Sequence, residues 1–269
     1  MKELASMSTE AFRGIKVVLT DIDDTLTTDG RLTSEAYSAL EALKNAKIKV
    51  IPVTGRSAGW CDHIARMWPV DAIVGENGAF YFRYDNTTKI MNKRFSQDKT
   101  ERVQDTKRLL ALREKLETEI PGCRAASDQD YRIADLAIDV AEDVTPLPSK
   151  DIRSIVAHAE EAGATAKVSS IHVNCWFGNH SKLSSSVQAL EECFGIDETN
   201  IQQQSLFVGD SPNDAQMFHY FDYSIGVANV LNTLEFLTDK PKYICKNSAG
   251  NGFVEVANRL LSAHKITNL

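Results

Sequence analysis

The chain has 269 residues, 43% of them hydrophobic and 25% charged, with a formal net charge of −7 at pH 7. This composition is ordinary for a globular protein, and the acidic balance argues against a nucleic-acid-binding surface, which needs a clustered basic patch. The five cysteines are odd in number and form no C-x-x-C pair, so they predict neither a disulfide framework nor a zinc site. Without an apolar leader or an apolar run long enough to cross a membrane, the sequence predicts a cytoplasmic protein.

The first third of the chain alternates strand and helix patterns. A β-branched run at 15–22 predicts a buried strand, and an apolar stripe at 33–46 predicts a helix after it. A strand at 48–55, a helix at 57–67 and a strand running through a turn at 71–82 continue the pattern. Successive strand–helix units predict a parallel sheet with right-handed crossovers.

The middle third has a different pattern. Helical spacing of leucines predicts a helix at 100–120, and a second helix is expected at 149–163. Apolar and polar residues alternate at 135–143 and again at 166–178, which predicts strands of a sheet with one open face. We therefore expect a separate α+β insert at roughly 85–177.

The last third returns to the first pattern. A helix is expected at 182–194, a strand at 205–210 and another strand at 223–229. The remaining segments are a helix from 213, a helix around 230–238, a strand at 243–246 and a closing helix from 252. The prediction is an α/β core formed by 1–84 together with 178–269, interrupted by the smaller α+β insert.

Polar residues follow the predicted core strands where those strands end. Asp21 and Asp23 end the first strand, and Asp210 ends a later one. The segment 54–56 (Thr-Gly-Arg) ends the second strand, and Lys182 opens a helix. Ligands of open α/β sheets bind beyond the carboxyl ends of the strands. We therefore expect these residues to meet at one edge of the sheet.

The residue types at this edge suit phosphoryl transfer. Crowded carboxylates repel one another unless a cation joins them, and the oxygens of Asp21 and Asp210 suit Mg²⁺. An aspartate is already ionised at pH 7 and can attack phosphorus, while Asp23, on the same side of an extended backbone, can protonate the leaving oxygen. A threonine hydroxyl, glycine-flanked amides and a lysine would neutralise the phosphoryl oxygens.

Four motifs occur in a fixed order: DIDDTLT (21–27), VTGR (53–56), Lys182 at a helix start and GDSPND (209–214). With these motifs the chain resembles the haloacid dehalogenase-like (HAD) phosphohydrolases. The resemblance implies a Rossmann-like parallel-sheet core with an inserted α+β cap. The insert that follows GENGAFYF resembles the type IIB cap of Cof-like, sucrose-phosphate and mannosyl-phosphoglycerate phosphatases.

The resemblance also implies roles in catalysis. Asp21 would be the nucleophile that forms an aspartyl-phosphate, and Asp23 would be the general acid and base. Thr54, Gly55 and Lys182 would bind the phosphoryl group, with Lys182 also holding Asp21 ionised.

The same resemblance implies a Mg²⁺ site. Its ligands would be Asp21, Asp210 and the backbone carbonyl of Asp23. Asn213 and Asp214 would support the metal site and position Lys182.

Further residues are candidates for substrate contact. Gly78 has an alternative role, since a glycine supplies a positive φ, and the face of the strand at 172–176 has the alternative of a solvated cap surface. Cations of the insert could meet a second anionic group, although the sequence does not place them: these are Arg124, Arg132 and Lys167. The candidates for substrate contact are Arg56, Asn77, Gly78, His172, Asn174 and Trp176.

The expected function is a Mg²⁺-dependent phosphatase acting on a small phosphorylated metabolite, with a phosphosugar as the expected substrate. A cap of this size would exclude bulky polymers and bulk water. A phosphomutase of the phosphomannomutase type is the first alternative, although the compact GDSPND motif is the hydrolase form. A non-catalytic protein that binds a phosphorylated ligand is the second alternative.

Overall fold

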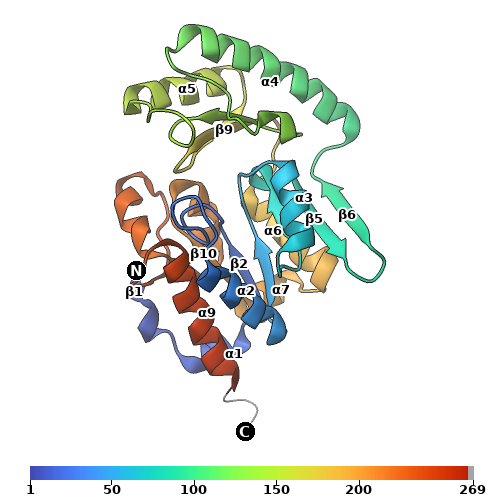
Figure 1. Cartoon of the computed structure of the whole chain (residues 1–269), viewed down its shortest axis with the longest axis vertical. Coiled ribbons are helices and arrows are strands. Elements are labelled where there is room, and N and C mark those ends of the chain that lie inside the picture. Colours follow the sequence, from blue (N-terminus) through green and yellow to red (C-terminus); the bar gives the residue numbers. More distant parts are fainter. Residues whose placement is uncertain (266–269) are drawn as a thin grey trace.

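The computed structural model describes residues 1–265, and its largest sheet has six parallel strands (Figure 1). β2 lies inside this sheet, where Val18 pairs with Leu206 on one side and Val50 on the other. In sheet order the strands are β1 (Lys2–Glu3), β12 (Tyr243–Ile244), β11 (Tyr223–Gly226), β10 (Ser205–Gly209), β2 (Val17–Thr20) and β3 (Lys49–Pro52).

Alternate residues of the central strands enter two hydrophobic cores, one on each face of the sheet. Val18 packs into the first core, and Val17 and Leu19 pack into the second. The first core is covered by α2 (Ser34–Asn45), α3 (Ala58–Met67) and α9 (Ala249–Lys265), with α1 (Thr9–Gly14) beside them. The second is covered by α6 (Lys182–Phe194), α7 (Glu198–Gln204) and α8 (Ala215–Tyr220).

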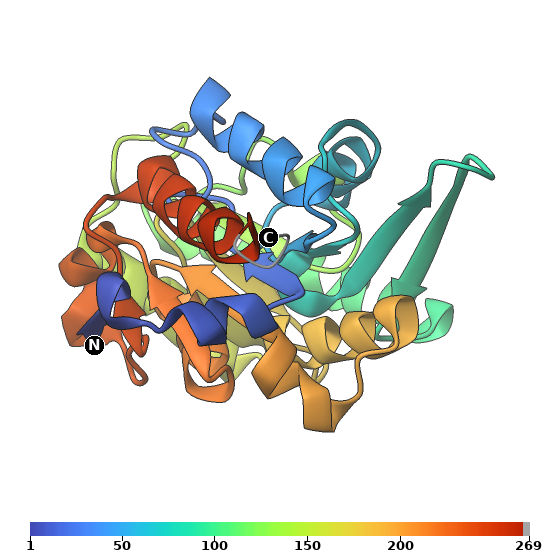
Figure 2. The ribbon, with the colours of Figure 1, turned by 90° about the horizontal axis from the view of Figure 1, so that it is seen from below.

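A second sheet extends the edge of the core. It is antiparallel and contains β4 (Ile73–Gly75), β5 (Phe80–Asp85) and β6 (Ile90–Phe95). Val74 forms a parallel bridge with Val53, which joins this sheet to the end of β3. The hairpin of β5 and β6 projects from the side of the molecule (Figure 2).

The third sheet belongs to the inserted cap and lies over the core, with two helices on its outer face (Figure 1). Val173 and Cys175 pack against those helices. His172 and Asn174, which alternate with them along the strand, therefore face the other way, toward the core. The strands are β7 (Leu136–Asp139), β9 (His172–Trp176) and β8 (Thr165–Val168), and the helices are α4 (Lys99–Glu119) and α5 (Ser149–Glu161).

The expected fold class, a parallel-sheet core with an inserted α+β cap, is confirmed. The single strand predicted at 166–178 is wrong, because the segment folds as a hairpin of β8 and β9. The Ser169 N–H donates to the carbonyl of His172 at the turn. The strand predicted at 135–143 ends at Asp139, whose carboxylate accepts the N–H groups of residues 141–143.

Two linkers join cap and core, and they lie side by side. A Cβ on Gly178 of the returning linker would lie 2.8 Å from the Gln97 side chain of the outgoing one. No helix in residues 1–265 is long and apolar enough to cross a membrane. The short 3-10 helices are η1 (Leu4–Ser6), η2 (Glu76–Gly78), η3 (Gln129–Tyr131), η4 (Pro212–Asp214) and η5 (Ala228–Phe236).

Candidate active site

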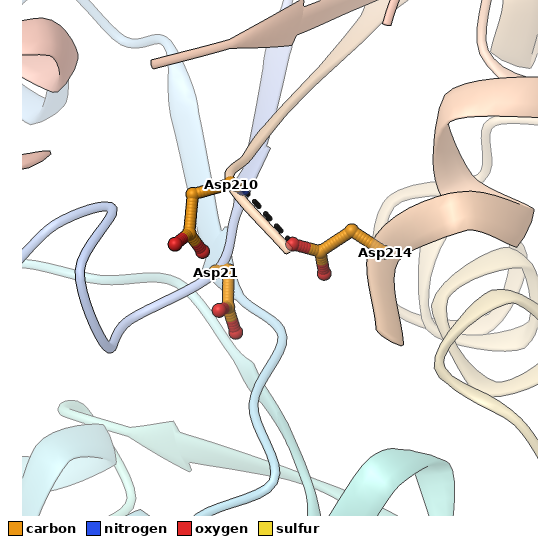
Figure 3. Close-up of side chains that lie close together, drawn as sticks. All are labelled: Asp21, Asp210 and Asp214. Atoms are coloured by element: carbon orange, nitrogen blue, oxygen red, sulfur yellow. Dashed lines mark hydrogen bonds between the residues drawn. The ribbon is translucent and has the colours of Figure 1, made fainter. Parts of the chain in front are cut away.

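Three aspartates meet at the carboxyl end of the parallel sheet (Figure 3). Asp21 follows β2, Asp210 follows β10, and Asp214 ends η4. Each offers a carboxylate oxygen, and these oxygens lie within 4.8 Å of one another. All three side chains are buried. Adjacent parallel strands therefore bring together residues that are far apart in the sequence.

Lys182 joins two of these carboxylates. Its Nζ donates to Asp21 Oδ1 at 2.9 Å and to Asp214 Oδ1 at 2.8 Å. Lys182 is the first residue of α6, whose N-terminus is capped by the Ser181 hydroxyl. Burial lowers the pKa of Lys182, but the two carboxylates outweigh it and raise that pKa above its usual value. Lys182 is therefore a buried cation fixed beside Asp21.

The crowding of the aspartates costs electrostatic energy. Burial is the main reason that the pKa of Asp21 rises to about 7, with Lys182 opposing it and Asp214 and Asp23 adding to it. Burial and the neighbouring Asp21 and Asp214 raise the pKa of Asp210 well above its usual value. A divalent cation would remove this repulsion, and a set of carboxylate oxygens fits a hard cation.

The three aspartates differ in how far protein donors already occupy their oxygens. Asp214 Oδ1 accepts from Lys182, and its Oδ2 accepts the N–H groups of Asp210 and Ser211. Within residues 1–265, the side chain of Asp210 accepts hydrogen bonds from two neutral donors, Thr25 and Asn229. Asp214 thus supports the surrounding chain, while Asp210 has more capacity to bind a cation.

The loop after β3 lies next to this cluster. Val53 donates its N–H to Thr20, so Thr54 follows directly beside the strand that carries Asp21. The Thr54 hydroxyl accepts the Arg56 N–H, which folds the loop tightly. Gly55 lies close to the side chains of Asn77 and Asn174, and a Cβ on it would meet both at 3.1 Å.

Arg56 pairs with Asp23 across the mouth of the site. Its Nε and Nη2 donate to the Asp23 carboxylate at 2.7–3.0 Å. One pocket between core and cap is lined by Asp21, Asp23 and Arg56 from the core and by His172 and Asn174 from the cap. Asn213 also lines this pocket, and its side-chain oxygen accepts from the Ser211 hydroxyl.

Some of the predicted contact residues lie elsewhere. Gly78 does not line the pocket and packs against the start of α6, where a Cβ would lie 2.0 Å from the carbonyl oxygen of Ser181. Trp176 is buried, stacks on His180 and donates its Nε1–H to the His180 carbonyl. Arg132 is buried in the cap and is fully engaged by Asp128, Asp135 and the carbonyl of Gly55.

Sequence reasoning missed two acidic residues at the contact between cap and core. Glu142 of the cap pairs with Arg56, which lines the pocket, with Oε1 2.7 Å from Nη1. Glu76 of the core is fully buried, and its carboxylate accepts the backbone N–H groups of Ile133, Ala134 and Asp135 from the cap. The GENG sequence around Glu76 indicates a turn, but it does not indicate a contact with the cap. No pattern in the sequence marks Glu142.

A family model described as haloacid dehalogenase-like hydrolase matches residues 18–116, the stretch that carries Asp21, Asp23 and the Thr54 loop. The expected resemblance to the haloacid dehalogenase-like hydrolases is confirmed. The expected enzyme class, a HAD-like phosphoric monoester hydrolase, is thereby confirmed. Phosphatases of this family generally use a divalent metal, which agrees with the acidic cluster.

This HAD-like hydrolase is similar to two archaeal phosphatases over most of its length. Phosphoglycolate phosphatase 1 of Saccharolobus solfataricus is 26% identical over 251 residues, which cover 92% of this chain and 96% of that protein. A phosphoglycolate phosphatase of Archaeoglobus fulgidus is 26% identical over 242 residues, covering 89% and 94% of the two chains.

Solved structures share the fold at lower identity. A Thermoplasma acidophilum protein superposes with a TM-score of 0.68 at 18% identity, covering 91% of this chain and 98% of that one. The sucrose-phosphatase of Synechocystis, solved with sucrose and phosphate, gives a TM-score of 0.62 at 15% identity, covering 92% and 98%. These likenesses extend to the cap as well as the core.

Proposed function

We propose that this hydrolase is a Mg²⁺-dependent phosphatase that cleaves a small phosphomonoester through an aspartyl-phosphate. The observation that carries the proposal is the bridge from Lys182 to Asp21 and Asp214, with Asp210 alongside. A nucleophilic carboxylate that accepts a hydrogen bond from a buried lysine is suited to phosphoryl transfer when a second carboxylate beside it can bind a metal ion.

In the first step, an Asp21 oxygen attacks phosphorus as the bond to the ester oxygen breaks. Asp23 gives its proton to the leaving oxygen and becomes a carboxylate. In the second step, water attacks the phosphorus of the aspartyl-phosphate, Asp23 takes the proton, and Asp21 is released with inorganic phosphate. Arg56 positions Asp23 through two of its nitrogen atoms, so the proton donor faces the pocket.

The remaining core residues would bind and neutralise the phosphoryl group. Thr54, the amides around Gly55 and Lys182 would contact its oxygens. Asp21, Asp210 and the backbone carbonyl of Asp23 would hold Mg²⁺, which supplies positive charge that brings the anionic substrate and nucleophile together.

Asn213 and Asp214 would support that arrangement. The two oxygens of Asp214 fix Lys182 and the loop that carries Asp210, while Asn213 faces the pocket. Neither residue acts on phosphorus in this scheme, and both position groups that do.

The cap would select the substrate. We propose that it begins at the capping box of α4, at Asp98, and returns to the core before Lys182. A phosphosugar remains one candidate substrate. The names of the two archaeal relatives add a second, a short phosphorylated acid such as phosphoglycolate.

The test is phosphate release from 4-nitrophenyl phosphate, 2-phosphoglycolate and a panel of sugar phosphates, with Mg²⁺ or with EDTA. Asp21→Asn removes the nucleophile, and we expect it to lower kcat by at least about 1,000-fold. Asp24→Asn is the matched control, since Asn tolerates the positive φ at this position. It should retain activity within about threefold.

Other outcomes would replace the proposal. Isomerisation of a sugar phosphate without free phosphate would indicate a mutase. Binding of phosphorylated compounds with no turnover, in the presence of Mg²⁺, would indicate a non-catalytic protein. Equal activity of Asp21→Asn and the parent enzyme would exclude Asp21 as the nucleophile.

A further inference from the structure

A carboxylate of the cap contacts two side chains that line the reaction pocket. Glu142 Oε1 lies 2.7 Å from Arg56 Nη1, and its Oε2 lies 3.0 Å from His172 Nε2. Arg56 and His172 both line the same pocket as Asp21 and Asp23. A carboxylate between a guanidinium and an imidazole is therefore part of the substrate-binding region.

The backbone that carries Glu142 is held in place. The buried Asp139 carboxylate accepts the N–H groups of Ala141, Glu142 and Asp143, which turns the chain directly after β7. This turn directs Glu142 toward the pocket. The contact with Arg56 is thus built by the cap itself.

The side chains of Arg56 and His172 are more deeply buried than the side chain of Glu142, which has access to solvent. The side chains of Arg56 and His172 are 9% and 3% exposed, and that of Glu142 is 28% exposed. His172 Nε2 is at ion-pair distance from Glu142, but the atoms are not aligned for a hydrogen bond. Among residues 1–265, this buried nitrogen has no hydrogen-bond partner. His172 Nε2 is therefore available to bind a better-placed atom of a ligand.

Glu142 is firmly ionised in this position. Burial alone would raise its pKa, but His172 and Arg56 outweigh burial and lower that pKa to about 2. Arg56 and His172 together consequently favour a negative charge at this point. A neutral hydroxyl placed here would leave the buried guanidinium poorly compensated.

We infer that Arg56 Nη1 and His172 Nε2 form the binding site for a carboxylate group of the substrate, and that Glu142 occupies this site until the substrate arrives. The inference rests on the proposed function, since it concerns the same pocket. Nε and Nη2 of Arg56 stay on Asp23 during the exchange. Binding of the substrate carboxylate therefore leaves the proton donor in place.

The choice of a carboxylate follows from Glu142 itself. The group that pairs with Arg56 and His172 is a carboxylate, and its replacement by another carboxylate conserves both charge and shape. The substrate class is then a phosphorylated carboxylic acid rather than a neutral phosphosugar.

The test compares two probes that differ only at this group, 2-phosphoglycolate and 2-hydroxyethyl phosphate. The readout is the ratio of their kcat/KM values on one enzyme preparation, so the fraction of folded enzyme cancels. We expect the acid to be preferred by at least about 30-fold. His172→Asn should reduce this preference to about threefold or less.

Glu142→Gln separates occupation of the site from support of Arg56. It removes the competing charge and keeps the shape, so KM for the acid should fall about three- to tenfold while the preference for the acid increases. Asp143→Asn is the matched control on the same turn, because the Asp143 carboxylate accepts a hydrogen bond from the Ser127 hydroxyl and does not line the pocket. It should leave the preference unchanged.

Several results would overturn the inference. The first is equal kcat/KM for the two probes in the parent enzyme. The second is a rise in KM for both probes with Glu142→Gln, which would mean that Glu142 only supports Arg56. The third is hydrolysis of 4-nitrophenyl phosphate without hydrolysis of either probe. Failure to release phosphate from any compound would instead contradict the proposed function.

Discussion

The core side and the cap side of the pocket are built in different ways. On the core side, Asp21, Asp210 and Lys182 are buried and are bonded to other core groups. On the cap side, Glu142 pairs with His172 of the cap and with Arg56 of the core. The core can therefore assemble its groups without the cap, whereas Glu142 acquires Arg56 as a partner when cap and core are in contact.

In the proposed mechanism, this difference separates chemistry from recognition. Substitutions on the core side should change the rate for every substrate alike. Substitutions on the cap side should change the ratio between substrates. The following predictions test that separation, beginning with the largest expected effect.

Lys182→Met should lower kcat by at least about 100-fold. It removes the cation that Asp21 and Asp214 share, and the loss of one partner from a buried ion pair should also cost about 3 kcal/mol of stability. Steady-state kinetics with both probes and urea unfolding check the two effects. The ratio of kcat/KM values should stay at the parent value. A change in the ratio would mean that Lys182 takes part in recognition.

Gly78→Ala should destabilise the core by more than about 3 kcal/mol. Its φ is 101°, and the new Cβ would lie 2.0 Å from the Ser181 carbonyl, directly before Lys182. Gly195→Ala is the matched control, with a φ of 64° and nothing within 4 Å of its Cβ, and should cost only about 1 kcal/mol. Urea unfolding measures both values. Equal losses would show that the backbone, and not the start of α6, determines the cost.

Glu76→Gln should loosen the contact between cap and core. The carboxylate accepts N–H groups from Ile133 and Ala134 of the cap and from Ala58 of the core, and an amide can replace only part of this set. We expect a loss of about 2 kcal/mol and a higher KM for both probes. Glu160→Gln, on the exposed surface of α5, is the control. An unchanged KM would mean that Glu76 stabilises the fold without holding the cap.

The smallest effect concerns Mg²⁺ and pH. Without metal, folded Asp21 holds a proton up to about pH 7, whereas the unfolded chain loses it near 3.8. The folded state thus binds more protons in this window, and its stability falls as pH rises from about 4 to about 7. Mg²⁺ should relieve that loss. The increase in Tm that Mg²⁺ produces should therefore be about 2–4 °C larger at pH 8 than at pH 5.

Thermal unfolding with and without Mg²⁺ measures this difference directly. Asp21→Asn should reduce the difference between the Mg²⁺ effects at the two pH values, because one titrating group is gone while Asp210 remains. A larger Mg²⁺ effect at pH 5 in the parent enzyme would contradict the assignment.

The meeting of the core residues was predictable because each of the proposed site residues stands at one end of a patterned element. Asp21 follows a β-branched strand and Lys182 begins an amphipathic helix, so the topology of a parallel sheet brings them to one edge. The helix expected around 230–238 folds as the 3-10 helix η5 at Ala228–Phe236, a difference in local winding that leaves the site unaffected.

The cap was less predictable, because its contacts depend on how it meets the core. The turn at Ser169–Ser170 contains no glycine, proline or asparagine, so a hairpin was taken for one strand. His172 and Trp176 share a face of β9, yet His172 lines the pocket and Trp176 packs on His180. Glu142 lies in a loop without periodicity, and only its distance to Arg56 identifies it.

The contact between the two linkers, at Gln97 and Gly178, also bears on how the chain folds. To the core, everything between those residues is a single long loop whose ends must meet before β10 can pair with β2. Closing a flexible loop of about 80 residues costs about 4 kcal/mol of chain entropy. A cap that folds first brings its own ends together and removes that cost. Early folding of the cap would then speed up the formation of the sheet that holds the aspartates.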